Sequence, residues 1–224
     1  MNIIITGATG KIGSLLAENY GKTDNLILQY FSNEKKMSDI ISNIQRFGNR
    51  YFSIKWDLAE NYSDFVTKSK QIFIPDVLIN CFSTYRENTF SDFRPHEFEK
   101  DIVSNALSPL WLTKEFAKIN PKITVINMLD IRTLMRDEKH FTYSMSKYLF
   151  AHLTEESAFY LAPCRVCGIA LGLNETDKIT DPSSLPIKEK TTFEDIKNTI
   201  DYIIENKHIT GEIISLDSGR HLRI

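Results

Sequence analysis

Short runs of apolar residues alternate along the chain with longer segments of helical spacing. The short runs are rich in Ile, Val and Leu, which is typical of strands covered on both faces. They predict strands at Ile3–Thr6, Leu26–Tyr30, Val77–Cys81, Ile123–Asn127, Arg165–Ile169 and Ile213–Leu216. A further run, Tyr51–Trp56, alternates more between apolar and polar residues, so we expect it nearer an edge of the sheet.

The longer segments have the apolar spacing of amphipathic helices. They predict helices at Ile12–Tyr20, Met37–Phe47, Pro95–Lys118, Phe141–Tyr160 and Phe193–Asn206. Thr192 precedes the last of these, with Glu194 and Asp195 in the first turn, so we expect Thr192 to be its N-cap. Strands and helices that alternate over residues 1–224 predict one α/β domain, a Rossmann-like doubly wound parallel sheet with helices on both faces.

The stretch from Gly172 to Lys190 follows neither pattern and contains Pro182 and Pro186. Loops longer than about 12–15 residues in a compact domain are usually lids or binding loops. We therefore expect residues 172–190 to form a loop that closes over a substrate.

The composition is that of an ordinary globular protein, with 42% hydrophobic and 25% charged residues. It excludes the disordered, collagen-like and disulfide-scaffold classes. The 27 Lys and Arg residues against 29 Asp and Glu give a net charge of -2, and we expect no nucleic-acid partner. No run approaches the roughly 20 apolar residues of a membrane span, and the N-terminus lacks the features of a signal peptide. We expect a cytoplasmic protein with no membrane partner.

The cysteine content is low. An odd number, three, favours reduced thiols. Cys164 and Cys167 form a C-x-x-C in a β-like run, and no second Cys/His pair stands at the spacing of a four-ligand zinc site. We expect both to be buried strand residues, and we predict no metal site.

A glycine-rich turn follows the first predicted strand. Its sequence is Thr6-Gly7-Ala8-Thr9-Gly10-Lys11-Ile12-Gly13, and a helix comes next. Glycines in this position allow a tight turn and bring backbone N–H groups and a helix N-terminus to a pyrophosphate. The turn, placed between an N-terminal strand and a helix, predicts that the protein binds a dinucleotide.

The end of the second strand predicts which dinucleotide is bound. An acidic residue there would bind the ribose 2′-hydroxyl of NAD, but this chain has no acid before Glu34. Lys11, and Lys35 or Lys36, are near enough in the sequence to supply positive charge to a 2′-phosphate. We therefore expect NADP(H) to be favoured over NAD(H). For Lys35 and Lys36, a solvated helix start is an equally good interpretation.

Tyr143 and Lys147 are four residues apart on a predicted helix and therefore face the same side. A phenol with a pKa near 10 is a poor acid or base at neutral pH, and an adjacent ammonium favours its ionised form. Such a pair can donate a proton to a developing alkoxide while a hydride arrives from a cofactor.

With these features the chain resembles the short-chain dehydrogenases/reductases over its full length. The motifs that carry the resemblance are Thr6-Gly7 with Gly13, Asp57-Leu58, Asn80, Asn105, Tyr143-x-x-x-Lys147, Ile209-Thr210-Gly211-Glu212-Ile213 and Asp217-x-Gly219. The resemblance implies that Tyr143 is the proton donor and that Lys147 lowers its pKa and holds the nicotinamide ribose. It also implies that Asn105 supports a water-linked proton relay.

The same resemblance implies which residues contact the cofactor. Asp57 and Leu58 are expected beside the adenine, and Asn80 beside the adenosine ribose. The other expected contacts are Gly7, Thr9, Lys11, Ile12, Gly13, Ser32, Ser83, Lys147 and Gly172.

Asp130 stands 13 positions before Tyr143, where most members of the family have a serine. An aspartate there resembles the pteridine reductases and the bacterial dihydromonapterin (dihydrofolate) reductases. By that resemblance Asp130 orients the substrate, Ser83 contacts cofactor and pterin, and Tyr85 stacks on the pterin ring. An aromatic face and a carboxylate suit a flat ring rich in N–H donors. The alternatives are that Asp130 caps the end of its strand and that Tyr85 is part of ordinary loop packing.

Four positions depart from the usual family pattern. Cys81 and Phe82 replace an Asn and an Ala, Leu171 replaces the Pro before Gly172, and Ser32 replaces an Arg that commonly holds the 2′-phosphate. Phe82 brings bulk close to the expected cofactor site.

The sequence therefore predicts an NADPH-dependent oxidoreductase that reduces a C=N or C=O bond of a small molecule, with a dihydropterin as a candidate substrate. A biosynthetic ketone or imine reductase acting on another substrate is an alternative. A catalytically idle dinucleotide-binding sensor or scaffold, suggested by Phe82 and Leu171, is a second. The family resemblance also implies a homodimer or homotetramer.

Overall fold

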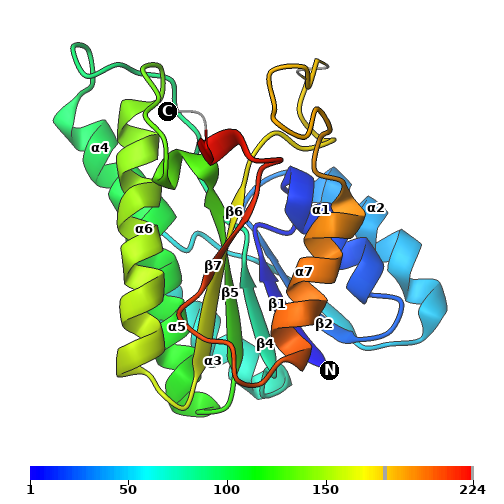
Figure 1. The fold of residues 1–224 in the computed structure, drawn as a ribbon. Coiled ribbons are helices and arrows are strands. Elements are labelled where there is room, and N and C mark those ends of the chain that lie inside the picture. Colours follow the sequence, from blue (N-terminus) through cyan, green and yellow to red (C-terminus); the bar gives the residue numbers. More distant parts are fainter. Residues whose placement is uncertain (179–180, 223–224) are drawn as a thin grey trace.

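A sheet of seven parallel strands runs through the middle of the protein, which the computed structural model describes for residues 1–178 and 181–222 (Figure 1). The strands are β1 (Asn2–Thr6), β2 (Asn25–Tyr30), β3 (Tyr51–Lys55), β4 (Val77–Asn80), β5 (Thr124–Asp130), β6 (Arg165–Leu171) and β7 (Ile213–Leu216). Their spatial order is β3-β2-β1-β4-β5-β6-β7, so the chain moves outward from β1 in one direction and, from β4, in the other. The predicted doubly wound α/β fold is confirmed, and β3 lies at an edge as its alternation predicted.

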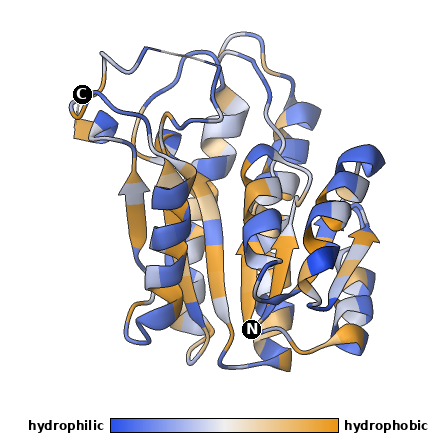
Figure 2. Ribbon diagram, turned by 90° about the vertical axis from the view of Figure 1, so that its right-hand side faces the viewer, coloured by the Kyte–Doolittle hydropathy of each residue, from blue (hydrophilic) through white to orange (hydrophobic). Residues whose placement is uncertain are grey.

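The central strands are apolar because both faces of the sheet are covered. Ile3, Ile4 and Ile5 of β1 are all fully buried. Successive side chains point to opposite faces. Ile3 and Ile5 therefore belong to one core cluster, and Ile4 belongs to the cluster on the other side. Figure 2 shows this distribution, with hydrophobic colour concentrated in the sheet and more hydrophilic colour on the helices.

Helices form the two outer layers (Figure 1). On one face lie α1 (Lys11–Tyr20), α2 (Glu34–Ile44) and α7 (Phe193–Glu205). On the other lie α3 (Tyr62–Ile72), α4 (Pro95–Ile102), α5 (Ser108–Ile119) and α6 (Phe141–Tyr160). α7 begins with a capping box, in which Thr192 Oγ1 accepts from the Asp195 N–H and the Asp195 carboxylate accepts from the Thr192 N–H. The predicted N-cap is confirmed.

The single helix predicted over Pro95–Lys118 is divided by a π-helical turn, Val103–Leu107, between α4 and α5. Pro109 lacks a backbone N–H and cannot donate to the carbonyl four residues earlier. The Ser108 hydroxyl donates to the Val103 carbonyl at 2.9 Å. Single π turns occur frequently at functional sites, and this one holds the buried Asn105.

The sequence patterns missed α3 and misplaced the ends of α2. Most of α3 is polar, and its buried residues are Phe65, Val66 and Ser69, too few for a clear helical stripe. The sequence feature that could have predicted the start of α3 is Asn61, whose side chain caps the helix by accepting from the Asp64 N–H at 3.2 Å. α2 begins three residues before the predicted Met37 start, and a 3-10 turn, Gln45–Phe47, follows its end.

Residues 1–178 and 181–222 contain neither a membrane-spanning helix nor a metal-binding cluster. No helix there is long and apolar enough to cross a membrane. No three His, Cys, Asp or Glu side chains in that part of the chain are grouped to hold a metal ion. Cys164 and Cys167 are free thiols and both are buried as expected, but only Cys167 is a strand residue, since Cys164 lies just before β6.

Candidate active site

The glycine turn between β1 and α1 is a close backbone approach. Gly7 has a φ of +62°, and a Cβ there would lie 2.8 Å from the Phe82 backbone N. A Cβ on Gly13 would lie 2.4 Å from the Gly7 carbonyl oxygen. The Gly7 N–H donates to Oε1 of the buried Gln29 at 2.8 Å, and Thr6 Oγ1 accepts from the Phe82 N–H at 3.3 Å. The turn is thus fixed by β2 and by the segment after β4.

The expected phosphate-side residues gather around this turn. Thr9 Oγ1 donates to the Ser32 carbonyl at 3.2 Å, so the exposed Ser32 lies beside the turn. Lys36 Nζ donates to the Gly10 carbonyl at 3.2 Å, which favours a role at the turn over a merely solvated helix start. Lys11 Nζ lies 3.6 Å from an Asp177 carboxylate oxygen. Ile12 packs against the core cluster of this face.

The residues expected beside the adenine, Asp57 and Leu58, lie in different surroundings. A hollow of about 340 Å³ is lined by Phe31, Lys55, Trp56, Asp57, Glu60 and Asn61. Asp57 Oδ1 accepts from the Ala59 N–H at 2.9 Å. Leu58 is 1% exposed and belongs to the core cluster, so its expected place beside the adenine stays a prediction. Phe82 also packs against that core cluster, so its bulk is partly taken up there.

Asn80 ends β4 beside β1, where the strand order reverses. Its Nδ2 donates to Asn127 Oδ1 at 2.9 Å. Its Oδ1 is buried and accepts no hydrogen bond from the described residues. In open α/β sheets, ligands bind beyond the carboxyl ends of the strands at this reversal.

α6 carries Tyr143 and Lys147 one turn apart, and both side chains are buried. The Tyr143 hydroxyl donates to Asp130 Oδ2 at 3.0 Å. Lys147 Nζ donates to the Met128 carbonyl at 3.0 Å and lies 5.9 Å from the centroid of the Tyr143 ring. β5 runs to Asp130, three residues past its predicted end, and so brings that carboxylate to Tyr143.

The surroundings of Tyr143 change its pKa. Burial, followed by the charge and hydrogen bond of Asp130, raises the pKa of Tyr143 well above 10. Tyr143 is therefore a protonated phenol near neutral pH, the state that an acid requires. Lys147 Nζ donates to a backbone carbonyl rather than to the phenol, and its expected lowering of the Tyr143 pKa stays a prediction. Burial lowers the pKa of Lys147 to about 8, with the Asp130 charge opposing the shift.

The Lys147 pKa leads to a pH prediction. The role implied for Lys147 needs its ammonium, and a pKa of about 8 means that this charge is present below pH 8 and lost above it. We expect kcat/KM for the reduced nicotinamide cofactor to fall about tenfold per pH unit above that value. A Lys147→Arg variant keeps its charge in this range and should not show the fall, at lower overall activity. A wild-type profile that stays flat to pH 10 would contradict this.

Asn105, in the π turn, fastens the segment after β4 to α6. Its Oδ1 accepts from the Thr84 N–H at 2.7 Å and from the Ser83 hydroxyl at 3.1 Å. Its Nδ2 donates to the Thr84 carbonyl at 3.1 Å and to Ser146 Oγ at 2.9 Å. The relay role expected of Asn105 stays a prediction. The structure shows it as the residue that positions Ser83.

Tyr85 packs against Tyr143 while remaining 58% exposed. Its ring centroid is 4.8 Å from that of Tyr143, in an edge-to-face arrangement, and 4.6 Å from that of His140. The structure therefore brings together Tyr85, Tyr143 and Asp130, with Ser83 two residues before Tyr85. Tyr85 packs against neighbouring rings, as its loop-packing interpretation expects, and it also presents the large exposed surface that stacking on a ligand needs.

Arg132 is the residue of this site that the sequence patterns missed. Its Nη1 donates to Asp130 Oδ2 at 3.0 Å and to Oδ1 at 3.2 Å, and its Nε donates to Asp137. Burial alone would lower the pKa of Arg132, but Asp130 and Asp137 raise it above its ordinary range, so it stays charged. Burial would raise the pKa of Asp137, yet hydrogen bonds from Arg132, the Lys139 backbone and His140 bring it to about 2. Asp130 also caps the 3-10 turn after β5 by accepting from the Arg132 N–H at 2.9 Å. This contact agrees with the alternative prediction that Asp130 caps the end of its strand.

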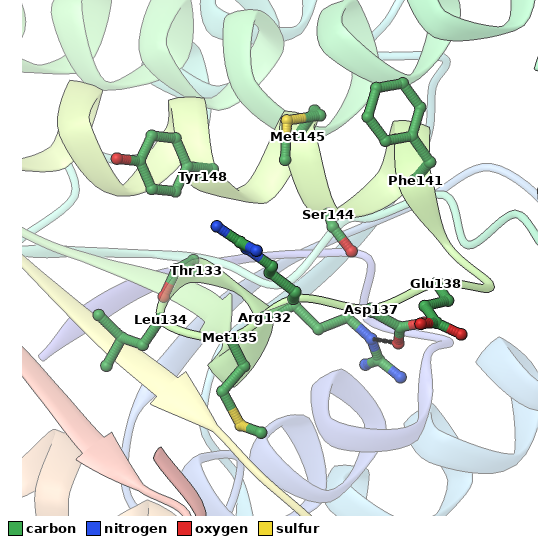
Figure 3. A pocket seen from close by; sticks show the side chains of 11 residues that line it. Arg132, Thr133, Leu134, Met135, Asp137, Glu138, Phe141, Ser144, Met145 and Tyr148 are labelled. Carbon is green, nitrogen blue, oxygen red and sulfur yellow. Dashed lines mark hydrogen bonds and ion pairs between the residues drawn. The ribbon is translucent and has the colours of Figure 1, made fainter. Parts of the chain in front are cut away.

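A pocket of about 490 Å³ lies between the segment that follows β5 and the first turns of α6 (Figure 3). Its lining includes Leu134, Met135, Phe141, Met145 and Tyr148. Arg132 and Asp137 form part of the same wall, with their ion pair drawn in Figure 3.

The stretch expected to be the substrate loop is irregular over its described residues, 172–178 and 181–190, while Ile179 and Thr180 lie outside them. A Cβ on Gly172 would lie 2.6 Å from Asp217 Cβ, so the loop leaves β6 in close contact with the chain after β7. Lys190 Nζ donates to the Asp177 carbonyl at 3.2 Å, and Asp177 in turn pairs with Lys11 of the glycine turn.

The glycine turn, the Tyr143/Lys147 pair and the fold together define a class of protein. Residues 1–183 match the family described as short chain dehydrogenase, and the chain belongs to that family. It is accordingly an oxidoreductase of the NAD(P)H-dependent short-chain type.

Known proteins similar to the chain are diverse in activity. A 3alpha-hydroxysteroid dehydrogenase of Mediterraneibacter gnavus is 21% identical, with 96% of this chain and 95% of that protein covered. The structure of FolM Alternative dihydrofolate reductase 1 from Brucella canis, complexed with NADP, has a TM-score of 0.92 and 24% identity, covering 100% of this chain and 95% of that one. A short-chain dehydrogenase/reductase from Serratia marcescens has a TM-score of 0.89 and 18% identity, covering 98% and 97%. The predicted family resemblance is confirmed, and FolM-type proteins are among the similar structures.

Proposed function

We propose that the protein is an NADPH-dependent reductase of a C=N or C=O bond, with a dihydropterin as the leading candidate substrate. The observation that carries the proposal is the buried, protonated Tyr143 hydroxyl, hydrogen-bonded to Asp130 at 3.0 Å and one helical turn from Lys147. A proton donor at this place matches a reduction, in which a proton must be added to the reduced bond.

The residues around the glycine turn fit a dinucleotide. Gly7 and Gly13 leave space that a Cβ would fill, and the buried Asn80 Oδ1 has no partner among the described residues. Bound NADPH supplies a hydride from nicotinamide C4. The α1 N-terminus would hold the pyrophosphate, and Lys147 the nicotinamide ribose. Three features support NADPH over NADH: the absence of an acid at the end of β2, the nearby Lys11 and Lys36, and the NADP named for the FolM structures.

Asp130, Tyr85 and Ser83 support a pterin-like substrate. Tyr85 offers an exposed aromatic face beside Tyr143, and Asp130 is a carboxylate that can accept from ring N–H groups. Tyr143 would deliver the proton, directly or through a water. The names of the FolM structures, alternative dihydrofolate reductases, support the same substrate class.

A second candidate is a reductase of a ketone or imine without pterin character. The observation that favours it is the ion pair of Arg132 with Asp130. The guanidinium already donates to the carboxylate oxygens that would accept from the N–H groups of a pterin.

The test is NADPH consumption by the purified protein with 7,8-dihydrobiopterin or dihydromonapterin, alongside fluorescence titrations of NADPH and NADH. We expect turnover of at least one pterin and tighter binding of NADPH. Tight NADPH binding without pterin turnover would favour the second candidate. Binding of neither nucleotide would overturn the proposal and leave an idle scaffold.

We also propose that the protein forms a homodimer or homotetramer through the helices over residues 95–118 and 141–160, which are α4, α5 and α6. Exposed side chains on α6, including Tyr148 and Phe159, support this arrangement. Closure of residues 172–190 over the substrate belongs to the same proposal, and the Asp177–Lys11 pair supports it by joining that stretch to the glycine turn.

A further inference from the structure

The Asp130 carboxylate is already occupied by donors of the protein. Its Oδ1 accepts from the Arg132 backbone N–H at 2.9 Å and from Arg132 Nη1 at 3.2 Å. Its Oδ2 accepts from the same Nη1 at 3.0 Å and from the Tyr143 hydroxyl at 3.0 Å. A substrate can therefore use Asp130 as an acceptor only by replacing the Arg132 guanidinium.

We infer that Arg132 is a specificity-determining residue: its guanidinium occupies the place on Asp130 that the paired N–H donors of a substrate must take. This inference rests on the proposed function and narrows its substrate class. The substrates admitted are flat rings that carry two adjacent N–H groups in amidine-like geometry.

The chemistry of the two groups matches. A guanidinium presents adjacent N–H donors in a planar fork, the geometry that a carboxylate accepts best. The amino-pyrimidinone edge of a pterin presents a ring N–H and an exocyclic amino N–H in the same plane. A simple ketone has no such donors, so it cannot replace the hydrogen bonds that Asp130 loses when Arg132 moves away. Sites built to hydrogen-bond a substrate group reject analogues that lack this group.

Arg132 is held so that it can leave Asp130 without leaving the site. Its Nε donates to Asp137, which also accepts from the Lys139 N–H at 2.8 Å and contacts His140 Nδ1 at 3.0 Å. The far end of the guanidinium is less constrained, because Nη2 reaches Tyr85 Oη only at 3.4 Å. Asp137 thus anchors the side chain while the Nη1 end can turn.

The pocket of Figure 3 supplies room for that turn. Arg132 forms part of its wall, and the volume of about 490 Å³ exceeds what a guanidinium needs. Tyr85 faces the space that would be vacated, with the Arg132 guanidinium 5.7 Å from its ring centroid. A flat ring that replaces the guanidinium on Asp130 would therefore lie against the same aromatic face.

The test compares Arg132→Met with the wild type and with Arg136→Met. Arg136 is an exposed arginine on the same pocket wall, and no hydrogen bond joins it to Asp130 in the described structure. The probe is pterin, which carries the ring N–H and the adjacent amino group, titrated by fluorescence in the presence of saturating NADP⁺. We expect Arg132→Met to bind it about tenfold more tightly than the wild type, the effect of removing one competing charge-assisted pair. Arg136→Met should bind it as the wild type does.

Kinetics give a second readout. We expect the KM for 7,8-dihydrobiopterin to fall by a similar factor in Arg132→Met, with kcat changed by less than about threefold. If Arg132→Met does not fold, Arg132→Lys replaces it, since an ammonium keeps the charge beside Asp137 but lacks the planar fork; its affinity should change in the same direction.

Unchanged or weaker pteridine binding in the Arg132 variants would overturn the inference. The absence of pteridine binding in every variant would also overturn it, even if NADPH-dependent reduction of a ketone were found. Tighter pteridine binding without turnover of any dihydropterin would instead uphold the role of Arg132 and refute the proposed reaction.

Discussion

Replacing Tyr143 by phenylalanine is expected to lower kcat by about a thousandfold, within the range usual for the loss of a positioned general acid. The Tyr143 phenol is the proposed proton donor, and its raised pKa keeps it protonated across the physiological range. The ring would remain and continue to pack against Tyr85, whose centroid is 4.8 Å away. NADPH affinity should therefore change less than about threefold, since the hydroxyl contacts Asp130 rather than the glycine turn.

The matched control is Tyr160→Phe. Tyr160 lies on the same helix, is 74% exposed outside the pocket of Figure 3, and packs edge-on against Phe159. Steady-state kinetics and a fluorescence titration of NADPH, run on both variants, separate chemistry from binding. Turnover retained in Tyr143→Phe would refute the role of this residue as proton donor, whatever the substrate.

A methyl group at Gly13 is expected to weaken NADPH binding by about a hundredfold. The added Cβ would lie 2.4 Å from the Gly7 carbonyl oxygen, and that atom is backbone and cannot move aside without opening the turn. Overpacking of this kind costs about 1–3 kcal/mol, and about 1.4 kcal/mol corresponds to a tenfold change in affinity. Gly7→Ala should behave similarly, because its φ of +62° adds strain to its own clash with Phe82.

Gly48→Ala is the control for this pair of variants. Gly48 also has a positive φ, +77°, but its Cβ would meet nothing within 4 Å, and it follows the 3-10 turn after α2, away from the glycine turn. Thermal unfolding should show a modest loss of stability in Gly48→Ala with NADPH affinity unchanged. Equal loss of NADPH affinity in Gly48→Ala and Gly13→Ala would show that the turn has no special role.

The sequence patterns were informative where a local rule decides the structure. Ile3, Ile4 and Ile5 predict a strand covered on both faces, and they are fully buried in β1. Tyr143 and Lys147 share one side of α6 because four residues make about one turn. In contrast, α3 has a weak apolar stripe, and its position depends on packing against α5.

The features of the site that the sequence did not predict depend on tertiary contacts. The Tyr143 pKa depends on burial and on Asp130, 13 residues earlier in the chain. The pair of Arg132 with Asp130 and Asp137 forms only because the chain reverses after β5 in a 3-10 turn. No spacing rule marks three residues with those separations as an ion-pair network. The family resemblance identified Asp130 as a site residue, whereas its ion pair with Arg132 is known only from the structure.

The two sides of the candidate active site share one support, the segment after β4. Thr6 at the glycine turn accepts from the Phe82 N–H, and Asn105 accepts from the Ser83 hydroxyl and joins the same segment to α6. A displacement of this segment therefore reaches both the glycine turn and the residues beside Tyr143. Substitutions there, in evolution or in engineering, must satisfy both halves of the site at once, whereas Asp130 and Arg132, on another segment, are free of that double constraint.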